Sequence, residues 1–221
     1  MSIISTMPPE SASLALAGAL QSFLSGPVDD GRVPRREGYA GLPPSLPDMA
    51  SLGLSQAPIL DVARVEQFRP LGVYTLRLDD VGTSAGIRAA ELTGWRFLVG
   101  NADQNLISCT VTRQAGTGAW QLTTAYYGPQ VKWVFRAKDA LASLQQIQAR
   151  SYELRILVIP AINVEAFWLY DPSPDAADLV AVYVDGTQYV VPTDAQPPAT
   201  FLRVFAPQLQ LAAASARRHA I

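Results

Sequence analysis

Three strand-like runs follow one another between residues 95 and 127, and they leave room only for short connections. The runs are WRFLVG, LISCTVTR and WQLTTAYY, and the stretches GNADQN and QAGTG join them. Both connections are rich in turn-forming residues, which is typical of β-hairpins. The sequence therefore predicts that these three runs pair as antiparallel strands.

Four more strand-like runs follow in the second half of the chain. YELRILVI and INVEAFWLY are separated by Pro160, which indicates a break between two strands. The end of INVEAFWLY is apolar on both faces, so we expect it to be covered on both sides. LVAVYV and TQYVV flank the Asp185-Gly186 pair, a strong signal for a two-residue hairpin loop. That loop predicts cross-strand pairs of Val182 with Tyr189 and of Val180 with Val191.

Helical segments surround these strands. Their expected positions are residues 7–25, residues 83–93, residues 137–150 and a last helix starting near residue 200 that Pro207 kinks or restarts. In the third of them, one apolar stripe contains Ala140, Leu141, Leu144 and Ile147. Hairpins flanked by helices predict an α+β fold, in which helices cover one face of an antiparallel sheet.

The first 60 residues differ from the rest of the chain, which forms the predicted α+β domain over residues 61–221. The helix over residues 7–25 has a narrow apolar face that must dock on the chain's own sheet or on another subunit. Residues 26–60 are rich in Pro and Gly and show no sustained period, yet they contain apolar residues such as Tyr39 and Leu42. An extended arm laid over a neighbouring surface explains these apolar residues better than a free linker.

The stretch GTSAG, residues 82–86, has the Gly-x-Ser-x-Gly spacing of a serine nucleophile on a tight strand-to-helix turn. It resembles the nucleophile motif of patatin-like lipid hydrolases, in which a Ser–Asp dyad acts without histidine. Because the aspartate of that family lies in an Asp-Gly pair, the resemblance implies a dyad of Ser84 and Asp185. The carboxylate would take the serine proton, and amides near Ala85 would hold the oxyanion.

Three other features favour a structural role for GTSAG. No glycine-rich oxyanion loop occurs in residues 40–80, and LDDV separates the preceding strand from Gly82. The remaining chain predicts antiparallel hairpins, whereas those hydrolases have a mostly parallel sheet. A helix N-cap role for Thr83 or Ser84 would explain the hydroxyl groups equally well.

Composition argues against several classes of function. The net charge of −2 and the pI near 5.4 leave no basic field for nucleic acid. A single cysteine, Cys109, and a single histidine, His219, exclude an intramolecular disulfide and multi-cysteine or histidine-rich metal sites. We expect no metal and no cofactor. We also expect no membrane span, because the apolar run LALAGALQSFL is short and polar residues interrupt it. It also lacks the basic region of a secretory signal, so we expect a cytoplasmic protein, and the excess of Arg over Lys indicates a bacterial one.

These observations favour a non-catalytic protein that mediates protein–protein interaction, as an assembly subunit of a larger bacterial complex. It would dock through its N-terminal helix and arm onto a protein partner or a second copy, with Trp133 as an exposed aromatic anchor. The predicted partner-binding residues are Leu16, Leu20, Phe23, Leu24, Tyr39, Leu42 and Trp133. Two alternatives stay open: a serine hydrolase that uses Ser84 and Asp185, and a domain that binds a small apolar ligand in a cleft between sheet and helices.

Overall fold

The computed structural model describes residues 2–4, 6–25, 70–100, 106–114, 116–127, 129–147, 150–173, 175 and 177–219. The side chains of residues 20–25 are not among the described ones. The predicted arm, including Tyr39 and Leu42, and the domain boundary at residue 61 therefore lie outside the described part.

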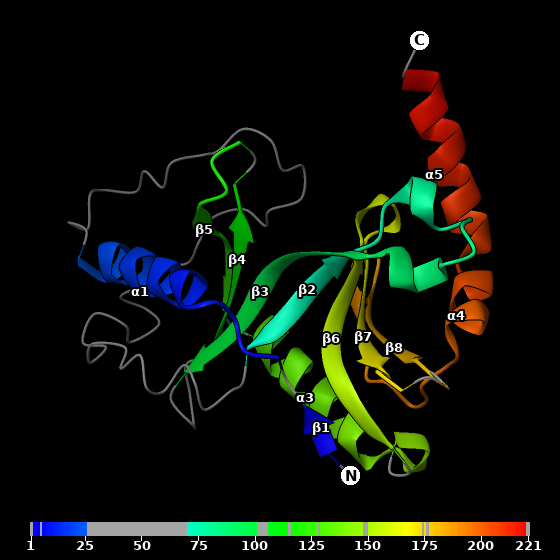
Figure 1. Cartoon of the computed structure of the whole chain (residues 1–221), viewed down its shortest axis with the longest axis horizontal. Helices are drawn as coiled ribbons and strands as arrows, with labels where there is room; N and C mark the ends of the chain where they lie inside the picture. Colours follow the sequence, from blue (N-terminus) through cyan, green and yellow to red (C-terminus); the bar gives the residue numbers. More distant parts are fainter. Residues whose placement is uncertain are drawn as a thin grey trace.

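The described part is a mixed α+β fold built on one mostly antiparallel sheet (Figure 1). Its strands are β1 (Ser2–Ile4), β2 (Leu71–Thr75), β3 (Glu91–Gly100), β4 (Leu106–Arg113), β5 (Trp120–Tyr127), β6 (Ser151–Ile159), β7 (Val164–Tyr170), β8 (Leu179–Asp185) and β9 (Gln188–Tyr189). Its α-helices are α1 (Glu10–Ser25), α3 (Pro129–Ser143), α4 (Pro198–Val204) and α5 (Ala206–His219). Short 3₁₀ helices connect them: η3 (Leu78–Asp80), η4 (Gly86–Ala89), η5 (Gln145–Ile147) and η6 (Pro160–Ile162).

The strand order is β5-β4-β3-β2-β6-β7-β8-β9, and β1 also pairs with β6. Most neighbours are antiparallel, but β2 and β1 both run parallel to β6. The prediction of an antiparallel sheet throughout is therefore wrong at its centre. The hairpins β3, β4 and β5 extend the sheet on one side of β2, and the chain then returns through α3 to add β6 on the other side. Such a crossover is what parallel neighbours require.

Helices cover both faces of the sheet, which corrects the prediction of helices on one face. Neighbouring residues of β7 show the arrangement: Phe167 belongs to the core that includes α3, and Trp168 belongs to the core that includes α4 and α5. On β3, Leu98 packs in the α3 core and Phe97 packs under α1. Phe167, Trp168 and Leu169 are all buried, so the predicted two-sided cover of this strand is confirmed.

Three β-bulges curve the sheet around α3. The pairing registers leave Thr93 in β3, Thr123 in β5 and Tyr183 in β8 as extra residues, and such residues increase the local twist and bend. In a flat sheet, Arg96 on β3 and Glu165 on β7 would lie about 14 Å apart, because β2 and β6 run between them. The long side chains of Arg96 and Glu165 reach towards each other across this spacing and meet at 2.5 Å. The curl of the sheet is shown by α3, which contacts β4 and β5 on one side of the sheet and β8 on the other.

The helix predicted for residues 83–93 does not form. Only Gly86–Ala89 makes a helical turn, and β3 already begins at Glu91. Gly86 has a φ of 55°, which no α-helix accommodates. Pairing of Glu91 with Thr75 of β2 provides backbone hydrogen bonds that outweigh the weak helical preference of this stretch.

The hairpin between β8 and β9 forms two residues away from the predicted register. Val184 pairs with Tyr189, and Asp185 pairs with Gln188, so the loop consists of Gly186 and Thr187. The predicted partners of Val182 and Val180 are therefore wrong. Of the two loop residues only Gly186 has a positive φ, of 60°, and a hairpin turn of the II′ class places glycine at its first loop position.

Other local predictions are confirmed. LISCTVTR and WQLTTAYY coincide with β4 and β5, η6 interrupts the chain at Pro160, and α1 ends at the predicted residue. Near Pro207 the last helix restarts, because α4 ends at Val204 and α5 begins at Ala206. The helix predicted over residues 137–150 is confirmed only over residues 137–143, because α3 spans Pro129–Ser143 and is followed by η5.

Candidate functional site

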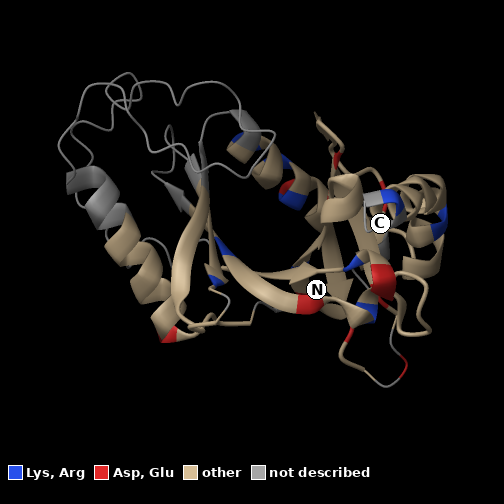
Figure 2. Ribbon diagram, turned by 90° about the horizontal axis from the view of Figure 1, so that it is seen from above, with Lys and Arg blue, Asp and Glu red and all other residues tan. Residues whose placement is uncertain are grey.

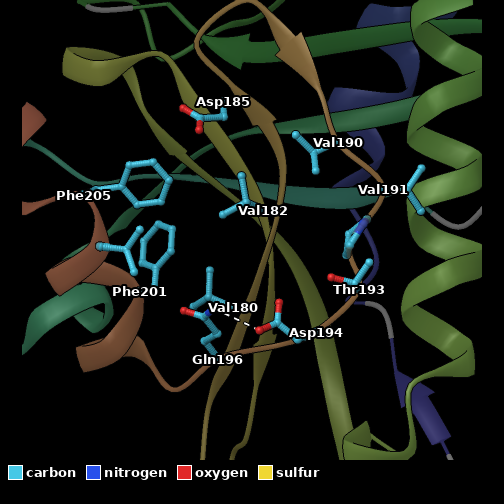
Figure 3. A pocket seen from close by; sticks show the side chains of 12 residues that line it. Val180, Val182, Asp185, Val190, Val191, Thr193, Asp194, Gln196, Phe201 and Phe205 are labelled. Atoms are coloured by element: carbon cyan, nitrogen blue, oxygen red, sulfur yellow. Dashed lines mark hydrogen bonds between the residues drawn. The ribbon is translucent and has the colours of Figure 1, made fainter.

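A pocket of about 200 Å³ lies between β8, the segment that follows β9, and α4 (Figure 3). Val180 and Val182 of β8 form its floor, with Phe201 and Phe205 on one side and Val190 and Val191 on the other. The complete lining is Val180, Val182, Asp185, Val190, Val191, Pro192, Thr193, Asp194, Gln196, Phe201, Val204 and Phe205. It is mostly apolar, with polar side chains from Asp185 and from residues 193–196.

The pocket exists because the chain after β9 leaves the edge of β8 and returns to it. The Val190 N–H donates to the Tyr183 carbonyl at 2.9 Å. Val180 and Gln196 then exchange two backbone hydrogen bonds of 2.8 and 2.9 Å. Between these two points Pro192 has no N–H to contribute to a ladder. The segment bows outwards, and Val182 stays only partly covered.

Helix α4 forms the opposite wall, and its ends are determined by proline and by Phe205. Pro198 occupies the first helical turn, where a missing N–H costs nothing. Phe201 and Phe205 are buried with their ring centroids 5.2 Å apart. Phe205 leaves the helical conformation, with φ −91° and ψ 2°, and ends α4. The wall is therefore a packed aromatic pair.

Two carboxylates lie at the rim. Asp185 and Asp194 are both exposed, and Figure 3 places them at opposite ends of the valine floor. The Gln196 Nε2 group donates to Asp194 Oδ2 at 3.0 Å. Within the described ranges neither carboxylate forms an ion pair. Asp185 and Asp194 are the only charged residues that line the pocket, so it carries a local excess of negative charge. Elsewhere in the described chain basic and acidic residues are interspersed (Figure 2).

The predicted catalytic pair is not brought together by hydrogen bonding. Ser84 is exposed in the turn between η3 and η4, and Asp185 is the last residue of β8. Among the described residues no hydrogen bond joins them, and Ser84 does not line the pocket. The Thr83 hydroxyl donates to the Asp80 carbonyl at 2.8 Å, which gives this hydroxyl a structural role in the turn.

A buried ionic network occupies the face of the sheet covered by α3. Arg96 Nη1 donates to Glu165 Oε2 at 2.5 Å and to the Tyr183 hydroxyl at 2.9 Å. The Tyr183 hydroxyl donates in turn to Glu165 Oε2 at 2.6 Å, and Arg96 Nε donates to Thr110 at 3.3 Å. Burial opposes the ionised form of Glu165, but the charge of Arg96 and the donated hydrogen bonds outweigh it and lower its pKa. Burial and the Glu165 carboxylate raise the pKa of Tyr183 well above its ordinary value.

The acidic loop DPSPDAAD connects β7 to β8 and is held by arginines. The Arg88 guanidinium forms two hydrogen bonds with Asp178, at 2.7 and 2.8 Å, and Arg150 donates to Asp171 at 2.8 Å. Hydrogen bonds from Ser173, followed by that from Arg150, lower the pKa of Asp171. The loop is a strand connection in which both buried carboxylates have cationic partners.

Arg155 of β6 lies in an aromatic cage on the other face of the sheet. Its guanidinium carbon is 3.6 Å from the ring centroid of Tyr170, 4.5 Å from that of Tyr74 and 4.9 Å from that of Trp168. The same guanidinium donates twice to Glu153, at 2.9 and 3.0 Å. Aromatic cages of this kind recognise cationic ligands in other proteins, but here the chain's own arginine fills the cage.

The predicted partner-binding residues have different environments. Leu16 is 1% exposed and packs in the core formed by α1 with β3 and β4, so its side chain is occupied within the chain. Trp133 lies on α3, half-buried, with the Arg136 guanidinium 5.3 Å from its ring centroid. Leu20, Phe23 and Leu24 lie on α1, but their side chains are outside the described part, as are Tyr39 and Leu42.

Cys109 of β4 is a buried structural thiol. It is fully buried under α1, and this burial raises its pKa to about 12. A thiol with that pKa is almost entirely protonated at neutral pH and is a poor nucleophile.

No protein-family model matches this chain, and no match was found among curated proteins or solved structures. Among the described helices, none is long and apolar enough to cross a membrane. The described residues also contain no group of three or more His, Cys, Asp or Glu side chains placed to hold a metal ion. The assignment of function therefore depends on the geometry of the chain itself.

Sequence reasoning missed the pocket because it extended β9 through Val191. Pro192 directly after the valines was a signal against that extension, because proline does not donate to a ladder. The register of the hairpin was the second missed signal. A two-residue loop with glycine at its first position, as in Gly186-Thr187, would have given the observed register.

Proposed function

We propose that this chain is a non-catalytic protein-interaction subunit, and that it binds through the surface around the β8–α4 pocket. The observation that carries the proposal is the exposed apolar surface at the pocket mouth. Val204 is 56% exposed and Val190 is 41% exposed, and both line the pocket. Tyr189, which precedes Val190, is 37% exposed. Single exposed apolar residues are ordinary, but apolar side chains gathered around a hollow are typical of binding surfaces.

The volume of the pocket favours a protein partner over a small ligand. Pockets for drug-sized molecules or cofactors have volumes of about 300–1,000 Å³, whereas this one has about 200 Å³. A pocket of that size suits an anchor side chain from a partner, the feature that dominates many protein interfaces. The small-ligand alternative is therefore the weaker one.

Point substitutions test this proposal better than deletion of residues 1–60. Deletion would remove β1 from β6 and would uncover Trp95 and Phe97 beneath α1. The double variant Val190→Ser/Val204→Ser removes only exposed apolar groups at the pocket mouth. Leu211→Ser on α5 is its matched control, because Leu211 is 71% exposed and does not line the pocket.

Two measurements test the proposal. The first is the solution mass of the full chain by light scattering, and the second is quantitative mass spectrometry of the proteins that the immobilised full chain retains from an extract of the source cells. We expect an association that the Val190→Ser/Val204→Ser variant loses and the Leu211→Ser variant keeps. A monomeric wild type that retains no protein above background would overturn the proposal. An association equally insensitive to both variants would also contradict it, because the pocket surface would not be involved.

A further inference from the structure

We propose that the β8–α4 pocket receives an aliphatic side chain from a segment of another protein, and that this segment carries Lys or Arg beside the anchor. The inference rests on the proposed function and specifies the chemistry of the partner. Three features of the pocket lead to it: the apolar side chains of its floor, the two carboxylates at its rim, and the hydrogen bonds and packing that hold its walls.

The floor selects an apolar anchor without a polar tip. Val180 and Val182 lie beneath the pocket, and Phe201 and Phe205 close one side (Figure 3). Branched aliphatic walls gain stabilisation from every CH₂ or CH₃ group that leaves water. A buried Tyr or Trp would need a partner for its O–H or N–H, and the floor offers only hydrocarbon. Leucine, isoleucine or methionine therefore suits this floor best.

The rim selects the neighbours of that anchor. Asp185 and Asp194 lie at opposite ends of the valine floor, so a cation on either side of the anchor meets a carboxylate (Figure 3). No Lys or Arg lines the pocket, and neither carboxylate has an ion-pair partner among the described residues. An acidic partner would face like charges, which oppose binding. Charge complementarity therefore favours a basic segment.

The walls are held in place before a partner arrives. Backbone hydrogen bonds fix the bowed segment at Val190 and at Gln196, and Ala195 within it is buried. The Phe201–Phe205 pair closes the other side. A preformed pocket avoids the ordering cost that weakens binding to flexible surfaces. A short peptide is therefore a suitable probe of the site.

The test uses the full chain and three peptides with acetylated and amidated ends. Their central sequences are Lys-Leu-Lys, Glu-Leu-Glu and Lys-Ser-Lys, each flanked by alanines. Methyl NMR of valine-labelled protein reports binding at the pocket. We expect Lys-Leu-Lys to shift the methyl signals of Val182, Val190 and Val204. Lys-Ser-Lys should bind at least about tenfold more weakly, because the buried apolar anchor is lost.

Neutralising the rim tests the charge argument. In the Asp185→Asn/Asp194→Asn variant, we expect affinity for Lys-Leu-Lys to fall about twofold to fivefold for each exposed charge removed. The preference over Glu-Leu-Glu should then largely disappear. Leu211→Ser should leave every titration unchanged. Equal binding of the three peptides, or shifts confined to methyl groups outside the pocket, would overturn the inference.

The outcomes separate this inference from the proposed function. If Val190→Ser/Val204→Ser abolishes association in cells but Lys-Leu-Lys is not preferred, the inference fails and the proposed function stands. If the peptides bind as expected but the full chain associates with no protein, the proposed function fails. A concentration-dependent self-association that the pocket variant loses would identify a second copy as the occupant and would overturn the inference of another protein's segment.

Discussion

Replacing Glu165 with leucine removes the carboxylate that neutralises Arg96 in the interior. The Arg96 side chain is 8% exposed and the Glu165 side chain is 24% exposed. Two hydrogen bonds, of 2.5 and 3.2 Å, join the guanidinium to the carboxylate, and the Tyr183 hydroxyl donates to the same group. The substitution therefore removes the carboxylate that the buried Arg96 guanidinium contacts and the acceptor of the Tyr183 hydroxyl.

The expected loss in the free energy of unfolding follows from this burial. Breaking a fully buried ion pair costs about 3–5 kcal/mol, because the remaining charge is stranded. Glu165 is partly accessible, so water can partly solvate Arg96 once the carboxylate is gone. We therefore expect the lower end, about 3 kcal/mol, for Glu165→Leu. Glu165→Gln keeps an acceptor for the guanidinium and should lose about 1–2 kcal/mol.

The double variant Arg96→Met/Glu165→Leu tests whether the loss in Glu165→Leu arises from the charge of Arg96. Replacing both members of a buried pair with apolar groups is often close to neutral, and here it leaves the hydroxyls of Tyr183 and Thr110 without these partners. We expect the double variant to lose about 1–2 kcal/mol, less than Glu165→Leu alone. Urea unfolding followed by tryptophan fluorescence measures these three variants and the single variant Arg96→Met. A double variant that loses the sum of the two single losses would refute the reasoning, since the two charges would then be independent.

The pKa of Glu165 in the folded protein is lowered from 4.5. The contribution of Glu165 to the free energy of unfolding is therefore complete above pH 4.5, and it is lost as the pH falls through the lower pKa of the folded protein. Between about pH 5 and pH 3, wild type should therefore lose more free energy of unfolding than Glu165→Gln, and parallel curves would contradict this. A Cβ at Gly94 would lie 2.6 Å from a backbone oxygen of β4, so Gly94→Ala should cost about 1–3 kcal/mol in urea unfolding. Gly82→Ala, where a Cβ meets nothing within 4 Å, is the control and should change little. Asp171→Asn should lower the melting temperature, because the buried carboxylate accepts hydrogen bonds from its loop and from an arginine. The control Asp175→Asn replaces an exposed carboxylate and should not lower it. Equal melting temperatures of the two variants would show that the Asp171 charge is unimportant.

The sequence predicted the elements that short-range interactions decide. β4 and β5 were placed correctly because turn-forming residues bound two strongly β-forming runs. The parallel pairing of β2 with β6 could not be predicted in the same way. Residues 73–75 pair with residues 156–158, so the pairing depends on how three hairpin strands and α3 fold between them. The local sequence pattern of β2 or of β6 does not indicate that the two strands pair with each other.

A difference in turn class explains the error in the last hairpin. An Asp-Gly pair is typical of a type I′ loop formed by both residues, and Gly186-Thr187 fits a loop in which glycine comes first. The turn preferences of these residues alone do not distinguish a loop of Asp185-Gly186 from a loop of Gly186-Thr187. The observed register places Asp185 opposite Gln188, and the chain after Val190 bows away from β8 until Gln196 pairs with Val180. The pocket was unpredictable without that register.

The GTSAG motif shows how spacing alone can mislead. A nucleophile elbow requires that the turn follow directly from a strand, whereas η3 lies between β2 and the motif. Thr83 bonds back to Asp80 within the turn. The catalytic interpretation of Ser84 stays an untested alternative, and labelling with a fluorophosphonate probe that Ser84→Ala abolishes would be needed to support it.

The buried network and the pocket meet at one residue of β8. The bulge at Tyr183 directs its side chain towards Arg96 and Glu165 on the α3 face. The carbonyl of the same residue accepts the Val190 N–H that begins the pocket wall, and the preceding residue, Val182, forms the pocket floor on the opposite face. The hydrogen bonds of Tyr183 with Arg96 and Glu165 therefore also hold the strand on which the pocket is built. These contacts matter at this edge of the sheet, because β9 spans only Gln188–Tyr189 and pairs with β8 over two residues.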